Sequence, residues 1–464
     1  MLRTTVALVV LSVPFLAQVP VDDAPATTEE LSQAELEALA AELADEVEAL
    51  RGAEFTEPVD VALADAESFR TYVTLRMQRL MPAERLASEE EVYKLLGLLP
   101  PELSYMQTMM SMLESQVGGF YDPGEDRFYL MKSFTGGLAE IILAHELTHA
   151  LDDQRWDLDA ELIRRLDNSD ALFAYQAVVE GSGVTVMNSW MFGNMTKLSI
   201  EEIQRVGNLG MEGLRDVPPA LWKPLLAAYV RGAAFLVNSE SANTGQMAKP
   251  IPAKIDAAFD QPPRSSEQIL HPKKYWDEPD EPVALDVSPA GLPDGVRVLA
   301  QDTLGELGAS LFVEPVARRH GLRSQADVLT ARYTSRAGEG WGGDRLVLVG
   351  KGRARALVWW TVWDTPQDAA EFAEATDKVL EHVRSATARW SAMRGFEGES
   401  NVRFRPAPEL DPERAHVLVS SGGFSASELD AILAGLAVQR RPAEPVAEEP
   451  APEREAPLED SPED

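Results

Sequence analysis

Two histidines flank a glutamate in the stretch LAHELTHALDDQ, residues 143–154. Each residue of an α-helix turns the chain by about 100°, so His145 and His149 would project from one face, about 40° apart. Imidazoles spaced in this way can share one zinc ion. Glu146 would lie beside them, where its carboxylate could take a proton from a water molecule that the metal activates. The motif predicts a catalytic zinc site on a helix from about 138 to 153. The alternative is a partly buried helix with two hydrogen-bonded histidines.

A catalytic zinc site usually has three protein ligands and one open position, so a third ligand must lie elsewhere in the chain. The metzincin pattern needs a glycine and a histidine where this chain has Asp152 and Arg155, which excludes that class. Glu180, in YQAVVEGSG, is the best candidate. It would end a helix from about 169 to 180 that returns antiparallel to the metal. Asp153 could accept a hydrogen bond from a ligand histidine or be a rival ligand.

The composition limits the chemistry further. The chain has no cysteine, so any metal must be held by histidine, carboxylate or water, and a cysteine nucleophile is excluded. Its 76 acidic and 42 basic residues give a formal charge of −34, which argues against nucleic acid and anionic lipid as partners. The simplest reason for such a surplus is a solubilising surface. A length of 464 residues suggests two or three domains.

The N-terminus, MLRTTVALVVLSVPFLAQVP, has Arg3 before an apolar run from Val6 to Ala17. This run is too short to span a bilayer, which needs about 20 residues, but it fits the apolar region of a secretory signal. We therefore predict a signal peptide and spacer over residues 1–24 and an extracytoplasmic protein, secreted or periplasmic, with no stable membrane span after signal removal. An uncleaved anchor or a buried N-terminal strand is the alternative.

The hydrophobic periodicity predicts two folded parts and an α+β fold overall. The first, residues 25–290, is expected to be an α-rich, zincin-like catalytic domain with a short edge-strand sheet. Helices are predicted over 31–52, over most of 64–118 and on to about 238, with strand-like pieces between Phe120 and Met131. The proline-rich stretch 245–295 is predicted to be an irregular wrap or linker.

The second part, residues 296–440, is expected to be a smaller α+β domain with an antiparallel sheet and helices on one face. Its pattern predicts a helix within 301–319, strands in DRLVLVG and ARALVWWTVW, a helix over 366–390, strands near 400–406 and 415–420, and a helix at 426–438. GEGWGG, residues 338–343, precedes a strand rather than opening a helix, which argues against a dinucleotide site. Residues 441–464 are acidic and proline-rich, and are expected to be a disordered tail.

The motifs resemble a known family. HExxH followed by a downstream glutamate is the gluzincin arrangement of zinc peptidases, which includes thermolysin-like enzymes. GGFYDP, HELTHALDDQ, VVEGSG and PPRSSEQILHP are similar to the motifs of a poorly characterised group of bacterial and archaeal neutral zinc metallopeptidases, and GWGGDRLVLV and WTVWDT resemble its downstream domain. The resemblance implies His145, His149 and Glu180 as zinc ligands and Glu146 as general base. The gap from His149 to Glu180 is longer than in thermolysin-like members.

Two further expectations follow from the resemblance. Gluzincins hold a peptide in extended form by backbone pairing to an edge strand beside the metal, and the segment from Phe120 to Met131 is placed to do this, unless it is an ordinary hairpin. Hydrolysis also needs a donor for the oxyanion that forms on attack. Tyr229 and His271 are the candidates, with Arg264 behind them, although each could equally be a structural side chain.

We therefore expect a Zn²⁺-dependent peptidase that acts on a protein or peptide substrate. Two other functions stay open. One is an extracytoplasmic binding or assembly protein that keeps a structural zinc site. The other is a zinc hydrolase that acts on a non-peptide amide. Cleavage that depends on Glu146 would separate a catalyst from a scaffold.

Overall fold

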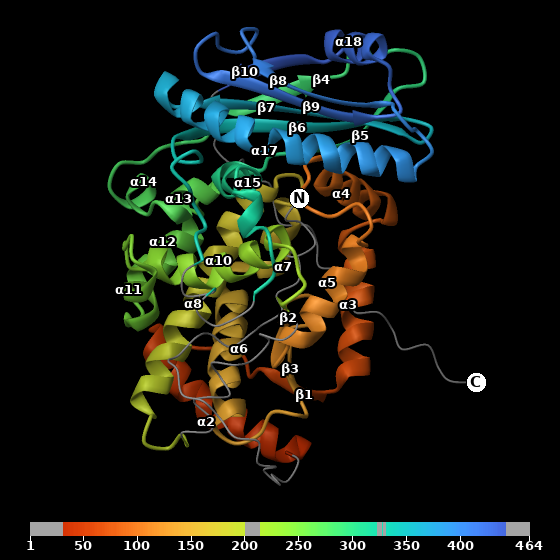
Figure 1. The fold of residues 1–464 in the computed structure, drawn as a ribbon. Helices are drawn as coiled ribbons and strands as arrows, with labels where there is room; N and C mark the ends of the chain where they lie inside the picture. Colours follow the sequence, from red (N-terminus) through yellow and green to blue (C-terminus); the bar gives the residue numbers. More distant parts are fainter. Residues whose placement is uncertain (1–30, 200–213, 323–326, 328–330, 442–464) are drawn as a thin grey trace, which may run out of the picture.

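The computed structural model describes residues 31–199, 214–322, 327 and 331–441 (Figure 1). The predicted signal and spacer, residues 1–24, lie outside the described residues, and so does the predicted tail except for its first residue. A tall helical body carries a five-stranded sheet at one end, and smaller sheets complete the structure. The predicted α+β fold class is confirmed.

The helical body is formed by the N-terminal part of the chain. Ser32 caps its first helix, with its side chain accepting a hydrogen bond from the Glu35 N–H, and Leu36, Leu43 and Val47 are buried where this helix packs against α6. The helices of this part are α2 (Gln33–Arg51), α3 (Ala66–Leu80), α4 (Ala83–Leu95), α5 (Tyr105–Gln116), α6 (Gly137–Trp156), α7 (Leu158–Arg164), α8 (Ser169–Gly193), α10 (Pro219–Leu236), α11 (Ala242–Met247), α12 (Pro252–Asp260), α13 (Ser266–Leu270) and α14 (Lys273–Trp276).

A small sheet lies against α6. Its strands are β1 (Asp60–Ala64), β2 (Gly119–Asp122) and β3 (Arg127–Met131), in the order β1-β3-β2. The strand-like pieces predicted between Phe120 and Met131 are confirmed as the antiparallel pair β2 and β3. β1 was not predicted: it is only five residues long and pairs in parallel with β3, a partner far away in the sequence.

The predicted C-terminal end of the helix that carries Glu180 is wrong. α8 does not stop at Glu180 but continues through EGSG to Gly193. The two glycines that suggested a helix end allow close packing instead. A Cβ on Gly181 would lie 2.5 Å from the carbonyl carbon of Gly232 in α10. Glycine therefore serves here to let two helices approach, and Glu180 stands inside a helix.

The proline-rich stretch is not a linker. It holds α11 to α14 and strand β4 (Ala284–Ser288), and Ile255, Phe259 and Ile269 are buried in the main core. Pro252 stands in the first turn of α12, where its missing N–H costs nothing, so this proline begins a helix rather than breaking one.

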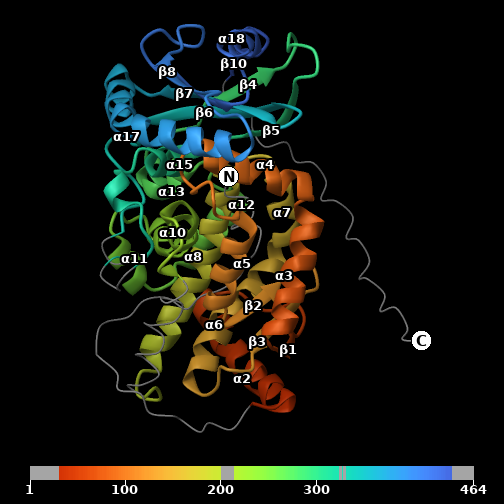
Figure 2. The same cartoon turned by 45° about the vertical axis from the view of Figure 1, so that its right-hand side comes forward.

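The C-terminal part contains an antiparallel sheet in the order β5-β6-β7-β9-β8. Figure 2 shows this sheet at one end of the helical body, with α17 between the two. The strands and helices predicted over 341–434 are present, but the helix predicted within 301–319 is shorter and follows strand β5. The elements are β5 (Arg297–Asp302), α15 (Gly305–Phe312), the 3-10 helix η2 (Val316–Arg318), β6 (Trp341–Lys351), β7 (Ala354–Trp363), α17 (Pro366–Met393), β8 (Ser400–Pro406), β9 (Ala415–Gly422), α18 (Ala426–Ala434) and β10 (Ala437–Arg441).

Both faces of this sheet are covered, not one as predicted. Along β6, Leu346 and Leu348 pack with α17 on the side of the helical body, whereas Val347 and Val349 pack with α18 and β4 on the other side. A strand that is apolar on both sides must be covered on both. β4 pairs with β10 in a separate two-stranded sheet, so residues 284–288, which precede the predicted boundary at 290, belong structurally to the C-terminal part.

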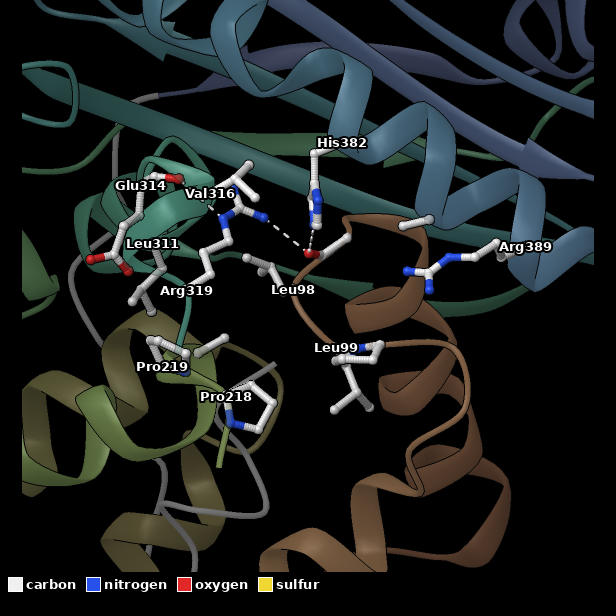
Figure 3. Close-up of a pocket in the computed structure, with 14 residues that line it drawn as sticks. Leu98, Leu99, Pro218, Pro219, Leu311, Glu314, Val316, Arg319, His382 and Arg389 are labelled. Carbon is white, nitrogen blue, oxygen red and sulfur yellow. Dashed lines mark hydrogen bonds between the residues drawn. The ribbon is translucent and has the colours of Figure 1, made fainter. Parts of the chain in front are cut away.

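The two parts share one core. A single buried cluster runs from Ala64 in the helical body to Leu418 in β9. A cavity of about 130 Å³ lies at the junction and is lined mainly by apolar side chains (Figure 3). Above it, Arg319 and His382 both donate to the Gly97 carbonyl oxygen at 2.9 Å. These hydrogen bonds connect α17 and the segment after Arg318 to the loop after α4.

None of the helices in the described ranges is both long and apolar enough to cross a bilayer.

Candidate metal centre

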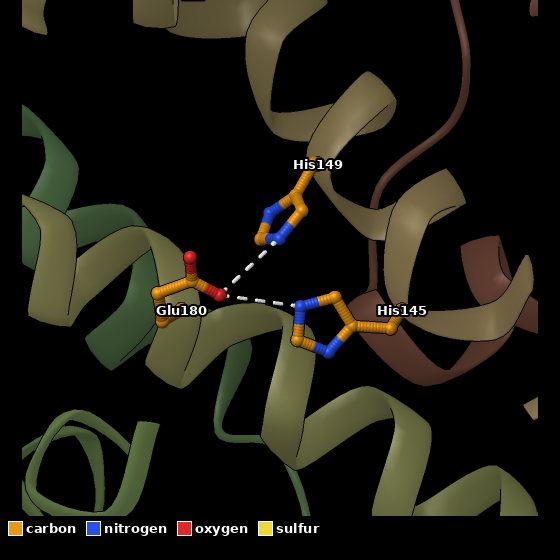
Figure 4. Close-up of side chains that lie close together, drawn as sticks. All are labelled: His145, His149 and Glu180. Carbon is orange, nitrogen blue, oxygen red and sulfur yellow. Dashed lines mark ion pairs between the residues drawn. The ribbon is translucent and has the colours of Figure 1, made fainter. Parts of the chain in front are cut away.

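Three side chains from two helices meet inside the helical body (Figure 4). His145 and His149 project from α6, and Glu180 projects from α8, which packs against it. One potential ligand atom from each residue lies within 4.8 Å of the other two, and all three side chains are buried. The imidazole rings lie edge to face, with centroids 4.5 Å apart.

The distances in this cluster fit a tetrahedral metal site. His145 Nε2 lies 3.3 Å and His149 Nε2 lies 3.6 Å from Glu180 Oε2. Two ligand atoms that are each about 2.0–2.1 Å from a zinc ion lie about 3.4 Å apart in a tetrahedron. Neither Nε2 atom has a regular hydrogen-bond partner among the described residues. Two imidazoles and a carboxylate are also the donor set of catalytic zinc sites.

The protonation of the cluster suits a cation. Burial, together with the neighbouring His149, lowers the pKa of His145 to about 4, so the imidazole is neutral at pH 7. Burial by itself would raise the pKa of Glu180, but its contacts with both histidines outweigh this and lower the pKa below its ordinary value. A neutral imidazole and an ionised carboxylate are the forms that bind a metal.

Glu146 lies next to this cluster and is fully buried. Burial raises the pKa of its carboxyl well above the ordinary range, the charge of Glu180 raises it further, and the Tyr121 peptide N–H acts in the opposite direction. Neither carboxylate oxygen has a partner of regular hydrogen-bond geometry within the described part of the chain. A buried carboxylate without a regular partner is a recognised mark of a functional site.

The edge of the small sheet faces Glu146. The Met131 N–H donates to the Gly118 carbonyl oxygen across the β2–β3 pair, so by alternation the N–H of Tyr121 points away from β3. The same N–H acts on Glu146. β2 is therefore the edge strand beside the site, as the sequence predicted, and all four of its residues are buried in this structure.

The predicted oxyanion donors are in different places. The Tyr229 ring, from α10, lies 6.0 Å from the His145 ring and nearly parallel to it. His271 instead lies with its Nε2 3.0 Å from Glu306 Oε1. That carboxylate outweighs the effect of burial and raises the pKa of His271. Arg264 forms an ion pair of 3.2 Å with Glu281. The structure thus brings Tyr229 to the cluster and gives His271 and Arg264 other partners.

Asp153, the predicted rival ligand, is occupied elsewhere. Its carboxylate accepts hydrogen bonds from Tyr121 Oη at 2.9 Å and from the Leu158 N–H at 2.6 Å. Its neighbour Asp152 is fully buried, three residues after His149 on α6, and accepts a hydrogen bond from Arg51 Nε at 2.8 Å. The sequence analysis missed this residue, because HALDDQ offers two adjacent acids and their directions depend on the surrounding helices.

Gly183 makes room for the metal-facing side of His145. A Cβ on this glycine would lie 2.6 Å from His145 Nε2, which is closer than any side chain tolerates. Gly183 stands three residues after Glu180, on the turn that faces the imidazole. The second half of VVEGSG therefore belongs to the site through its lack of a side chain.

A second cluster of potential metal-binding side chains differs from the first, because it consists of acids alone. Glu267, Asp280 and Asp364 also come within 4.8 Å of one another. The ammonium group of Lys274 lies among them, at 2.6, 2.8 and 3.2 Å from their carboxylates. This lysine supplies the positive charge of that group.

The comparisons with known proteins concern the other end of the chain. A family model described as a domain of unknown function (DUF8575) matches residues 296–433, which lie in the C-terminal sheet and its helices. No curated protein and no solved structure matches the chain. The matched span does not include His145, Glu146, His149 or Glu180, so the interpretation of the metal centre depends on its own geometry.

Proposed function

We propose that this chain is a zinc-dependent peptidase. The proposal depends on the meeting of His145, His149 and Glu180 at ligand-to-ligand distances that suit zinc. Beside them lies a buried carboxylate with no regular partner among the described residues. Zinc held by these three residues would supply a Lewis acid for the hydrolysis of a peptide bond.

The protein groups around the cluster have separate tasks in this proposal. Glu146 takes a proton from the attacking water on its carboxylate and passes it to the nitrogen of the leaving amine. The outward-facing backbone groups of β2 pair with an extended peptide. The phenol of Tyr229 is the candidate donor to the oxyanion. Because β2 is buried in this structure, a peptide reaches this edge only when the surrounding packing opens.

The test compares Glu146→Gln with the parent protein. The amide keeps the size of the side chain but cannot accept the proton, so zinc content should stay the same while cleavage of casein falls by about 10² or more. Glu267→Gln is the matched control, because Glu267 is also buried but pairs with Lys274 in the separate acidic group. That variant should keep the parent's cleavage rate.

The scaffold alternative predicts a different result. If the parent holds one zinc ion per chain and cleaves no protein or peptide, the site is structural and the peptidase proposal is wrong. If Glu146→Gln cleaves as fast as the parent, Glu146 is not the base. The peptidase hypothesis and the scaffold hypothesis both require that His145→Ala and His149→Ala lose zinc.

A further inference from the structure

Arg51 is a buried cation at the end of α2, with an exposed fraction of 0%. Its Nε donates to Asp152 Oδ1 at 2.8 Å, and its Nη2 lies 2.8 Å from Asp256 Oδ1 in α12. The guanidinium carbon also lies 5.5 Å from the centre of the Trp156 ring. Arg51 and Asp152 are 101 positions apart in the sequence, so only the folded chain brings them together.

Asp152 connects this cation to the metal centre. It is 0% exposed and stands three residues after His149 on α6, so the two side chains occupy neighbouring positions on one side of the helix. The hydroxyl of Ser182 lies beside the same carboxylate. Ser182 belongs to α8 and follows Glu180 by two residues. Asp152 therefore stands between the helix of the two histidines and the helix of the third ligand.

Stability alone does not account for this ion pair. Removing an arginine and an aspartate from water costs several kcal/mol for each ion, and an apolar pair of similar size often holds helices as well or better. Acids that surround a metal site, by contrast, fix the orientation of its histidines, and their loss weakens metal binding. The location of Asp152 matches this second role.

We infer that Arg51 and Asp152 are positioning residues of the metal centre: Arg51 holds Asp152 in place, and Asp152 fixes His149 relative to α8. The inference rests on the proposed zinc site. It makes α2, which supplies no ligand, part of the machinery that assembles that site.

The test measures the zinc dissociation constant of the folded full chain, by competition with a chromophoric chelator at constant pH. Arg51→Lys keeps the positive charge but loses the planar fork that reaches two carboxylates at once. Asp152→Asn keeps the shape and removes the anion. Each variant should bind zinc about 10 to 100 times more weakly than the parent. The double variant should be no weaker than the weaker single variant, because both changes break one contact.

Arg76→Lys is the matched control. Arg76 is also nearly buried, at 5% exposure, and bridges two carboxylates, those of Asp122 and Asp159, from α3. Its replacement should lower the melting temperature and leave the zinc dissociation constant unchanged. If zinc binding depended on charge alone, Arg51→Lys would bind zinc like the parent.

The outcomes distinguish this inference from the proposed function. Unchanged zinc affinity in folded Arg51→Lys and Asp152→Asn, with zinc lost from His149→Ala, overturns the positioning role and leaves the metal site standing. Retention of zinc by His149→Ala overturns the metal site itself. Equal weakening by Arg76→Lys, or failure of both site variants to fold while Arg76→Lys folds, assigns Arg51 and Asp152 to general stability and also overturns the inference.

Discussion

Glu146 and Glu180 are buried carboxylates beside the same two histidines, but their contacts differ. Glu180 Oε2 faces both Nε2 atoms, whereas the oxygens of Glu146 face β2 and have no regular partner in the described structure. This difference supports the ligand role proposed for Glu180 and the proton-transfer role proposed for Glu146.

Replacement of Glu180 and replacement of Glu146 should therefore have different effects. Glu180→Ala removes a ligand atom and should weaken zinc binding by more than about 100-fold, beyond the usual effect of an outer acid. Excess zinc should restore part of its cleavage activity. Zinc titration of the folded variant gives the affinity. If Glu180→Ala binds zinc like the parent, the third ligand is a different residue.

Gly183 offers a test in which no ligand is changed. Gly183→Ala places a methyl group 2.6 Å from His145 Nε2, so the imidazole must move away from its partners. We expect a folded protein with little bound zinc, measured by metal analysis after dialysis. Gly193→Ala, in the same helix and with no atom of the described residues within 4 Å of the new methyl group, should keep its zinc. Full zinc content in Gly183→Ala would contradict the placement of His145.

At the scale of the elements, the site depends on how closely α8 approaches α10. A Cβ on Gly232 would lie 1.9 Å from the Ala177 carbonyl oxygen. This contact sets the distance between the helix of Glu180 and the helix of Tyr229. The sequence between His149 and Glu180 comprises the end of α6, α7 with the turns on either side of it, and the first part of α8.

Gly232→Ala should therefore destabilise the protein by about 1–3 kcal/mol or more, the usual cost of forcing a group into a packed interface. Urea unfolding of the variant and the parent gives the difference. Gly193→Ala, where there is open space, should change stability by less than about 1 kcal/mol in the same experiment. Equal urea midpoints for Gly232→Ala and the parent would show that α8 and α10 can move apart without loss of stability.

At the scale of the whole molecule, one buried acid contacts both the helical body and the C-terminal part. Asp170, in the first turn of α8, accepts a hydrogen bond from the Ser266 N–H at 2.8 Å. Its carboxylate also fills the space beside Gly305, whose φ of +71° and missing side chain allow this contact. Burial, with a smaller contribution from the charges of Asp344 and Glu306, raises the pKa of Asp170 from 3.8 to about 8, although its hydrogen bonds with Ser266 act in the opposite direction.

This shift predicts a pH dependence with a definite sign. The folded protein holds the proton of Asp170 more tightly than the unfolded chain, so its stabilising effect is complete below about pH 4 and is lost as the pH rises to about 8. The amide in Asp170→Asn does not ionise, so this variant does not lose stability in this way as the pH rises. Its melting temperature relative to that of the parent should therefore rise between pH 5 and pH 8.5. A constant difference across this range would show that Asp170 is ionised in the folded protein.

The sequence by itself determined the elements whose pattern is local. The period of α6 placed His145, Glu146 and His149 on one helix, and apolar runs and turn residues located α17 and the strands β6 to β9, because these signals lie within single elements. The wrong predictions arose where one residue type serves two purposes. Gly181 and Gly183 allow close packing inside a helix as well as ending one, and Pro252 begins a helix as well as breaking one.

Only the tertiary structure decided which distant groups meet. It brought Glu180 to the histidines, paired Asp152 with Arg51 and Asp153 with Tyr121, and gave His271 to Glu306. It also paired β4 with β10 and covered the second face of the sheet. These contacts follow from how helices and sheets pack around a shared core, where close approach at a single glycine or one buried arginine sets the geometry. No local period in the sequence carries that information.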